Sequence, residues 1–175
     1  MTDAITRSLT LAALPLVLPL ARWAVPPAPG PGGYLALVGG VLSGAGHRIF
    51  NASDYSVIAG GSSNRIQILS PGGFIGGGQL NGIVNSSTNS VIAGGAFNQV
   101  SRDHSFIGGG AEQTNRSSYA FLGGGKDNLV DSDSDYSAIS GGRDNTIAAN
   151  SLYATIAGGY LNDIGTNSDY SAISG

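Results

Sequence analysis

The acidic run "DSDSD" at residues 131–135 comes nearest, in residue types and spacing, to a metal site. Asp131, Asp133 and Asp135 alternate as the first ligands of an EF-hand calcium loop do, but the glycine and the closing glutamate of that loop are missing. We interpret the run as a solvated surface loop, with a surface cation as the lesser alternative. No residue is therefore predicted as a metal ligand.

The sequence matches neither a phosphate-binding loop nor a catalytic triad. A phosphate-binding loop needs Gly-Lys followed by Ser or Thr at the start of a helix, whereas Lys126 is followed by Asp127 and by no helical pattern. His47 and His104 lie far apart in the sequence, and neither is near a Ser–Asp arrangement suited to a triad. The sequence predicts no catalytic residue, no cofactor and no enzymatic activity.

Composition favours a β structure rich in turns. The 175 residues include 29 Gly and no Cys, and only 11% are charged, against a usual quarter or so. The polar residues are mainly Asp, Asn and Ser, which favour turns and caps over helix interiors. The net charge is −3 and the arginines are scattered, so the basic stripe of a nucleic-acid-binding protein is absent from the sequence.

Glycine pairs divide the chain after residue 34 into repeats. The first pair begins at Gly39, and the later spacings are 21, 17, 17, 15, 15, 17 and 17 residues. A repeated period of this length is the signature of a stacked solenoid. The glycines predicted to form its turns are Gly60, Gly61, Gly77, Gly78, Gly94, Gly95, Gly109, Gly110, Gly124, Gly125, Gly141, Gly142, Gly158 and Gly159.

Apolar residues recur at two fixed positions of the repeat. A single apolar residue on an alternating background indicates a short strand with one buried face. Coils stacked at the ~4.8 Å spacing of strands would align such residues into ladders. The core ladder predicted two residues before each glycine pair is Ile58, Ile75, Ile92, Ile107, Leu122, Ile139, Ile156 and Ile173. A second apolar set is Ile66, Ile83, Val100, Val130, Ile147 and Ile164.

An asparagine recurs three residues after the second glycine, with Gln113 as the one departure. Asparagine can bond to its own backbone in a turn, and stacked amides can pass hydrogen bonds along a column. A row that binds a metal or a glycan is the alternative. The predicted Asn ladder is Asn64, Asn81, Asn98, Asn128, Asn145 and Asn162.

Aromatic rings often stand five residues before the glycine pair. We expect them to pack along the outer rim of neighbouring coils, and a stripe that stacks on sugars is the alternative. The rings are Tyr34, Tyr55, His104, Tyr119, Tyr136, Tyr153 and Tyr170.

The N-terminal part has a different character. Its apolar stretch, Leu9 to Leu20, is twelve residues long and contains two prolines, so it is shorter than the ~20 residues of a membrane-spanning helix. A signal-peptide cut after Ala24 would place Arg22, and one after Ala21 would place Pro19, where the cleavage site needs a small residue. We predict an apolar anchor at residues 1–25, with a cleaved signal peptide as the alternative. Residues 26–33 form a Pro/Gly linker, and residues 34–175 a repeat shaft.

A coil of 15–17 residues is thin, and a single chain is expected to leave one apolar wall uncovered. Gly-rich chains also lose much conformational entropy on folding and have few large side chains to offset it. Parallel copies that close a shared core would remedy both problems. We therefore predict a parallel homotrimer, with a monomeric β-helix of wider coils as the alternative.

The runs "YSVIAGG", "NSVIAGG", "HSFIGGG" and "YSAISGG" resemble the head repeats of trimeric autotransporter adhesins. Similar Ile-Gly-Gly-Gly-x-x-Asn repeats occur in fibre and spike proteins of phages and large algal viruses. The resemblance covers residues 34–175 and implies a parallel β-roll assembled as a trimer. The chain departs from the adhesin pattern because it has Gly-Gly and then Asn where those heads have one Gly followed by alanines.

The expected fold class is all-β, a repeat-built parallel β-helix or β-roll with 15–17 residues per coil. The expected function is a non-enzymatic fibre or spike on a virion surface. Its residues 1–33 would bind a capsid, tail or cell-surface base protein, and its target would be a host-surface glycan or protein. The alternatives are the head of a secreted bacterial adhesin at the cell surface and, as a minor one, a β-helical carbohydrate-active enzyme. Glycosylation at the sequons of Asn51, Asn85 and Asn115 is left open.

Overall fold

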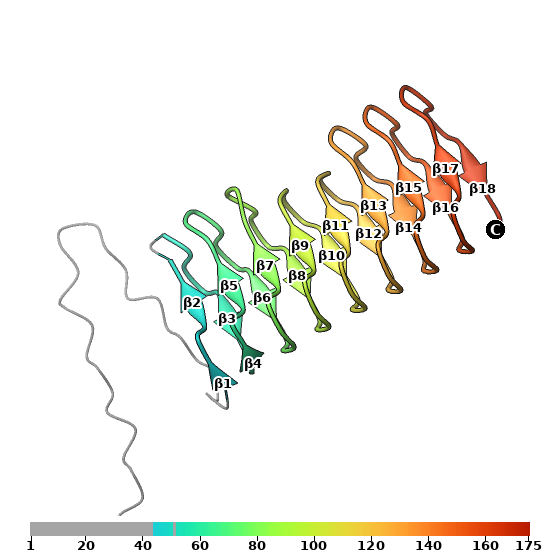
Figure 1. Ribbon diagram of the computed structural model, residues 1–175. Coiled ribbons are helices and arrows are strands. Elements are labelled where there is room, and N and C mark those ends of the chain that lie inside the picture. Colours follow the sequence, from blue (N-terminus) through green and yellow to red (C-terminus); the bar gives the residue numbers. More distant parts are fainter. Residues whose placement is uncertain (1–43, 51) are drawn as a thin grey trace, which may run out of the picture.

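The computed structural model describes residues 44–50 and 52–175. The predicted anchor at 1–25, the linker at 26–33, the start of the predicted shaft and Asn51 lie outside these residues. Every strand of the described chain is two residues long, and every strand pair is parallel. Among these residues, no helix is long and apolar enough to cross a membrane. The predicted all-β fold of stacked parallel repeats is confirmed, and Figure 1 shows the coils following one another in a row.

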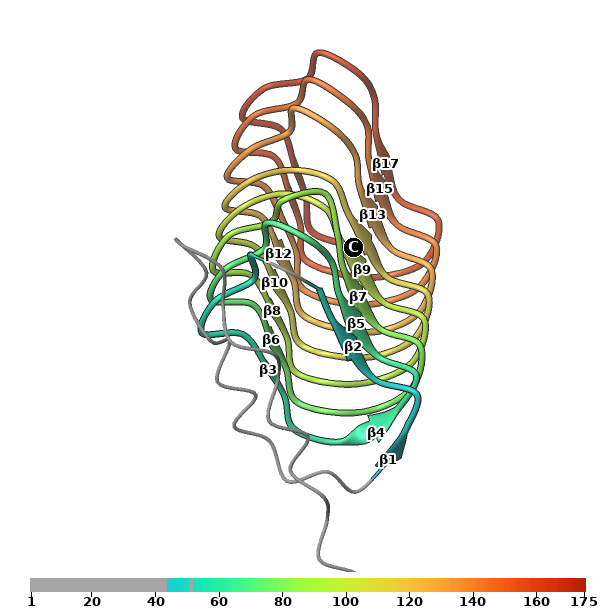
Figure 2. The ribbon, with the colours of Figure 1, turned by 90° about the vertical axis from the view of Figure 1, so that its left-hand side faces the viewer.

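Two long sheets run the length of the stack, and each coil contributes one strand to each sheet (Figure 2). The first sheet contains β3 (Val57–Ile58), β6 (Phe74–Ile75), β8 (Val91–Ile92), β10 (Phe106–Ile107), β12 (Phe121–Leu122), β14 (Ala138–Ile139), β16 (Thr155–Ile156) and β18 (Ala172–Ile173). The second sheet contains β2 (Arg48–Ile49), β5 (Arg65–Ile66), β7 (Gly82–Ile83), β9 (Gln99–Val100), β11 (Thr114–Asn115), β13 (Leu129–Val130), β15 (Thr146–Ile147) and β17 (Asp163–Ile164).

A third column of pairs closes the coil on its glycine side. It begins with β1 (Gly44–Ala45) and β4 (Gly61–Ser62), which pair in parallel. It continues as single bridges, which we call the bridge column: Ser62, Gln79, Ala96, Ala111, Lys126, Arg143 and Tyr160.

The register explains why the repeat is sometimes 17 and sometimes 15 residues long. Across the glycine corner, the core residue of the first sheet is always followed eight residues later by that of the second, as from Ile92 to Val100. The return loop from the second sheet to the first varies. It takes nine residues from Ile83 to Ile92 but seven from Val100 to Ile107. The shortening is therefore confined to one corner, and both ladders keep their phase.

The first described coil begins at the glycine corner. Gly44 pairs with Gly61, seventeen residues later, and the glycine pair at Gly39 lies outside the described residues. With this register, His47 stands opposite Asn64, and its Nδ1 accepts a hydrogen bond of 3.3 Å from the backbone N–H of Asn64. The histidine thus occupies the place that asparagine takes in the later coils.

The core lies between the two sheets and is closed within a single chain. In each strand of the first sheet from β3 to β16, the second residue is buried between the sheets. The core residues of both sheets belong to one cluster, in which no member is more than 4% exposed. The second apolar set covers the first across a narrow coil, while the outward residues Phe74, Phe106 and Phe121 of the first sheet stay partly exposed.

Candidate functional site

The structure places the predicted core ladder along the inner face of the first sheet. The side chains of Ile75, Ile92, Ile107, Leu122, Ile139 and Ile156 are fully buried, and Ile58 is 2% exposed. Ile173, in the last coil, is partly buried against the same cluster. These residues pair in register from one coil to the next, so the ladder is continuous.

The structure places the predicted Asn ladder inside the glycine corner, where each amide ties two coils together. The Nδ2 of Asn81 donates to the carbonyl of Gly77 in its own coil (2.9 Å) and to that of Gly95 in the next (2.8 Å). Its Oδ1 accepts from the backbone N–H of Asn98 at 3.0 Å. The same pair of donor bonds is made by Asn64, Asn98, Asn128 and Asn145. Because these amides are buried and bonded, they are not available as a row of ligands for a metal or a glycan.

The two glycines of each corner have different roles. Gly95 has a φ of 91°, and a Cβ on it would lie 2.1 Å from the carbonyl oxygen of Gly110 in the next coil. Gly94 has no atom within 4 Å of the position of a Cβ. At this corner, only the second glycine is therefore required by backbone conformation and by close packing. Gly61, Gly78, Gly110, Gly125 and Gly142 share the φ and the contact of Gly95.

One coil departs from this pattern in two buried positions. Gln113 stands in the Asn ladder, is fully buried, and has no hydrogen-bond partner for its Nε2 or its Oε1. Asn115 stands in the core position of the second sheet, where its Nδ2 donates to the carbonyl of Ala120 at 3.2 Å. Because Asn115 is fully buried, its sequon is not accessible in the folded chain, whereas Asn85 is exposed.

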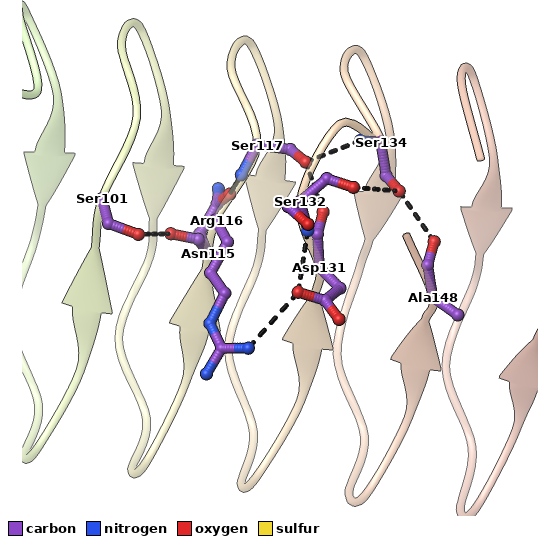
Figure 3. Close-up of polar contacts among 8 residues, drawn as sticks. All are labelled: Ser101, Asn115, Arg116, Ser117, Asp131, Ser132, Ser134 and Ala148. Carbon is purple, nitrogen blue, oxygen red and sulfur yellow. Dashed lines mark hydrogen bonds and ion pairs between the residues drawn. The ribbon is translucent and has the colours of Figure 1, made fainter. Parts of the chain in front are cut away.

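Serine ladders form a further set of internal contacts, which the repeat pattern does not predict. Along the return loops, the Oγ of Ser134 donates to the carbonyl of Ala148 (2.7 Å), and the backbone N–H of Ser134 donates to the Oγ of Ser117 (2.8 Å), as Figure 3 shows. In the next coil, the Oγ of Ser151 donates to the carbonyl of Gly165 and accepts a hydrogen bond from the backbone N–H of Ser168. The signal in the sequence is a serine two residues before the aromatic position, which resembles ordinary turn composition.

The acidic run lies on the return loops, and two of its carboxylates are used by the fold. Oδ1 of Asp131 accepts from the backbone N–H of Ser132 (2.8 Å) and from Arg116 (3.3 Å), as Figure 3 also shows. Oδ1 of Asp135 accepts from the backbone N–H of Ser118 in the preceding coil (2.8 Å). Within the described part of the chain, no group of three His, Cys, Asp or Glu side chains could hold a metal ion.

A shallow open pocket lies beside the acidic run and crosses three return loops. Its lining consists of Asp133, Asp135, Asn150, Leu152, Asn167 and Asp169. His47 and His104, the two histidines of the sequence, belong to different columns and lie outside this lining. The described residues thus bring carboxylates and amides together here without a nucleophile–base pair.

Five rings form a stacked column on the outer rim, which we call the aromatic column: His104, Tyr119, Tyr136, Tyr153 and Tyr170. Successive ring centroids are 4.9–5.1 Å apart, and the ring planes differ by 5–9°. All five residues have φ between 54° and 61°. Their backbone N–H groups donate to the preceding coil, as Tyr136 does to the carbonyl of Ser118 at 3.2 Å.

The aromatic column presents ring edges to solvent, since the ring faces contact one another. A sugar that stacks on an aromatic face would find a free face only at the two ends of the column. Tyr55 occupies the same position of the repeat and is 84% exposed, but Gly72 and Asn89 stand at this position in the two coils that follow it. Tyr55 is therefore outside the stack.

Charged residues gather at the glycine corner in the C-terminal half. Nζ of Lys126 lies 3.9 Å from Glu112 and 3.5 Å from Asp127, and Arg143 pairs with Asp144 at 3.1 Å. The pKa of Glu112 is raised, chiefly by its hydrogen bond with Asp127 and by the like charge of that carboxylate, while Lys126 acts in the opposite direction. These groups are exposed, so they shape the surface charge more than the stability.

The arrangement as a whole is a scaffold of ladders: two apolar, one of amides, one of serine hydroxyls and one of stacked rings. Comparison of the chain with protein-family models, with curated proteins and with solved structures gives no match.

Proposed function

We propose that the chain is a non-enzymatic structural protein: a trimeric β-solenoid shaft of a fibre or spike, held at its N-terminal end in a virion capsid or tail and projecting for host attachment. One observation carries the proposal. The buried polar groups of the described coils, with the exception of Gln113 and the Nε2 of His47, are bonded mainly to neighbouring coils. The hydrogen bonds of the interior thus hold adjacent coils together.

Such a stack suits a mechanical role. Eight coils at ~4.8 Å would extend about 40 Å, with apolar and amide ladders parallel to the long axis. A load applied along or across the rod would be shared among the hydrogen bonds between coils, and few backbone groups would be open to proteases. The function of the shaft would be to provide length and stiffness and to project for display.

The trimer in this proposal needs an outer surface, because the core of one chain is already closed. The outer face of the first sheet offers one. Phe74, Phe106 and Phe121 are 39%, 36% and 42% exposed there, and Val57 and Val91 lie in line with them. The outward residues of this sheet include no charged side chain, so parallel copies would meet without repulsion. The second sheet, in contrast, presents Arg48, Arg65 and Asp163.

Analytical ultracentrifugation of the full chain tests the trimer. We expect the mass of three chains, and we expect Phe106→Asp to shift it to one chain. Thr114→Asp, on the second sheet of the same stretch, should leave the trimer intact. A monomeric wild-type chain at tens of micromolar would reject the trimer. It would not reject the shaft, which the next experiment tests.

Cryo-electron microscopy of the assembled particle tests the shaft and its anchor. We expect residues 1–33 to contact a capsid or tail protein and the coils to point outward. Density that shows residues 1–33 exposed and without a partner would reject the anchor.

The head of a secreted bacterial adhesin is the second candidate, favoured by the resemblance of "NSVIAGG" to adhesin repeats. Mass spectrometry of the natural protein separates the two candidates. A mature chain that begins after residue 24 would support the adhesin, and a retained residue 1 would support the anchored shaft.

A further inference from the structure

We propose that the aromatic column is a site of oxidative cross-linking, at which one-electron oxidation joins the tyrosines of consecutive coils as dityrosine. The residues are Tyr119, Tyr136, Tyr153 and Tyr170, and each is separated from the next by seventeen residues. The inference concerns the chemistry of the column and holds whether or not the chain is a fibre.

The geometry places the phenol rings of consecutive coils against one another. Tyr119 and Tyr136 have centroids 4.9 Å apart with planes within 6°, and the next two pairs are 5.1 Å apart. The backbone beneath each ring is fixed by its hydrogen bond to the preceding coil, as from the N–H of Tyr153 to Asp135 (3.1 Å). Rings held side by side react at an effective concentration far above that of free tyrosine.

The same rings are open to an oxidant. The tyrosines of the column are 46–76% exposed, and their edges, which carry the hydroxyl groups and the adjacent ring carbons, face solvent. A ring attached through two rotatable bonds can tilt from the stacked position, so the ortho carbons of neighbouring rings can meet while the backbone stays in place.

The reaction balances with a peroxide or another one-electron oxidant as the electron acceptor. Each of two phenols loses one electron and one proton and becomes a phenoxyl radical. A bond forms between the ortho carbons of the two radicals, and the hydrogen on each of these carbons then moves to its oxygen, which restores both aromatic rings. The net change is the loss of two protons and two electrons, and one molecule of hydrogen peroxide that accepts them becomes two molecules of water.

Contact between ring faces also favours the meeting of two radicals. A radical formed on one ring of a stack can exchange an electron with the next ring, so the first and second oxidations need not strike neighbouring residues. Coupling occurs wherever two radicals come to adjacent positions. The column is therefore expected to link at any of its three tyrosine pairs. Tyr55, which has no stacked neighbour among the described residues, is expected to stay unlinked.

The test is photo-oxidation of the full folded chain with a ruthenium tris-bipyridyl complex and persulfate. The readouts are dityrosine fluorescence and mass spectrometry of peptides. We expect linked peptides that join Tyr119 to Tyr136, Tyr136 to Tyr153 and Tyr153 to Tyr170. An equimolar mixture of ¹⁴N- and ¹⁵N-labelled protein distinguishes links within one chain from links between chains, and we expect few mixed-label products at low micromolar concentration.

Matched variants locate the reaction. Tyr136→Phe keeps the ring and removes the phenol, so it leaves one adjacent tyrosine pair of three and should lower the yield of dityrosine to about a third. Tyr55→Phe should leave the yield unchanged. Equal linking of Tyr55 and Tyr153, predominantly mixed-label products, or single-ring oxidation without dityrosine would each overturn the proposal. Oxidation of the urea-unfolded chain should lose the pair selectivity, and retention of the selectivity there would show that stacking is not its cause.

Discussion

The Oδ1 of Asn98 accepts a 3.0 Å hydrogen bond from the backbone N–H of Gln113, but the side chain of Gln113 makes no hydrogen bond to the next coil. One extra methylene thus interrupts a ladder that Asn128 and Asn145 resume, with a bond of 3.0 Å from the N–H of Asn145 to Oδ1 of Asn128. The interruption lies beside Asn115, the polar residue in a core position of the second sheet.

Gln113→Asn should repair the ladder and stabilise the chain. An asparagine at this position would reach the carbonyls of Gly109 and Gly125 as its neighbours reach theirs, and it would satisfy a buried amide. We expect the free energy of unfolding to rise by about 1–3 kcal/mol, measured by chemical denaturation. Asn81→Gln, the reverse change in an intact coil, should lower it. An unchanged or lower stability of Gln113→Asn would mean that the shorter coil cannot accommodate the asparagine.

Gly95→Ala should be much more damaging than Gly94→Ala. A Cβ at residue 95 would lie 2.1 Å from the carbonyl of Gly110, and φ is 91°, whereas a Cβ at residue 94 would meet nothing within 4 Å. We expect a loss of several kcal/mol at residue 95 and a change below about 1 kcal/mol at residue 94. Thermal unfolding followed by circular dichroism measures both. Equal effects of the two substitutions would contradict the assignment of different roles to the two glycines.

Ile92→Ala should open a cavity between the sheets. The side chain of Ile92 is fully buried, while its neighbour Val91 faces outward and is half-buried. We expect Ile92→Ala to lower the free energy of unfolding by about 2–5 kcal/mol and Val91→Ala to lower it considerably less. If urea unfolding gives the same loss for both, the core does not lie where the burial of these residues places it.

Glu112 should make a small contribution to the pH dependence of stability. Its pKa is raised above the ordinary 4.5, mainly by the hydrogen bond with Asp127, so the folded state binds a proton more readily than the unfolded chain does. The stability that this group contributes is complete below pH 4.5 and is lost as the pH rises through the raised pKa. The melting temperature of the wild-type chain, taken relative to that of Glu112→Gln, should therefore decrease from pH 4 to 7. A steeper fall in the variant would show that the sign is wrong.

The period and chemistry of the repeat made the fold predictable. A glycine pair, an apolar residue and an asparagine at constant offsets indicate stacked parallel strands, because each column must match itself from coil to coil. What local patterns could not give was the thickness of the coil. The short repeat does not indicate that Ile83 and Val100 lie across from the first-sheet ladder and close the core within one chain.

Other parts of the site escaped prediction for reasons that concern single residues. Ser117 and Ser134 look like ordinary turn residues, and only the register shows that their hydroxyls bond the neighbouring coil. His47 does not match the asparagine pattern, and its place opposite Asn64 follows only from the pairing of Gly44 with Gly61. The orientation of stacked rings also depends on the left-handed backbone of Tyr136 and its equivalents, which a sequence pattern does not specify.

The return loop that shortens from nine residues to seven without shifting either ladder has a consequence for adding sequence to the chain. A guest peptide spliced between Val130 and Ile139 would leave the neighbouring core contacts in place, because the glycine corner alone sets the phase of the next coil. The same splice between Ile92 and Val100 would shift the strands of every later coil out of register. The rod therefore has one permissive edge, along which cargo could be mounted at intervals of a single coil, and one edge that tolerates no insertion.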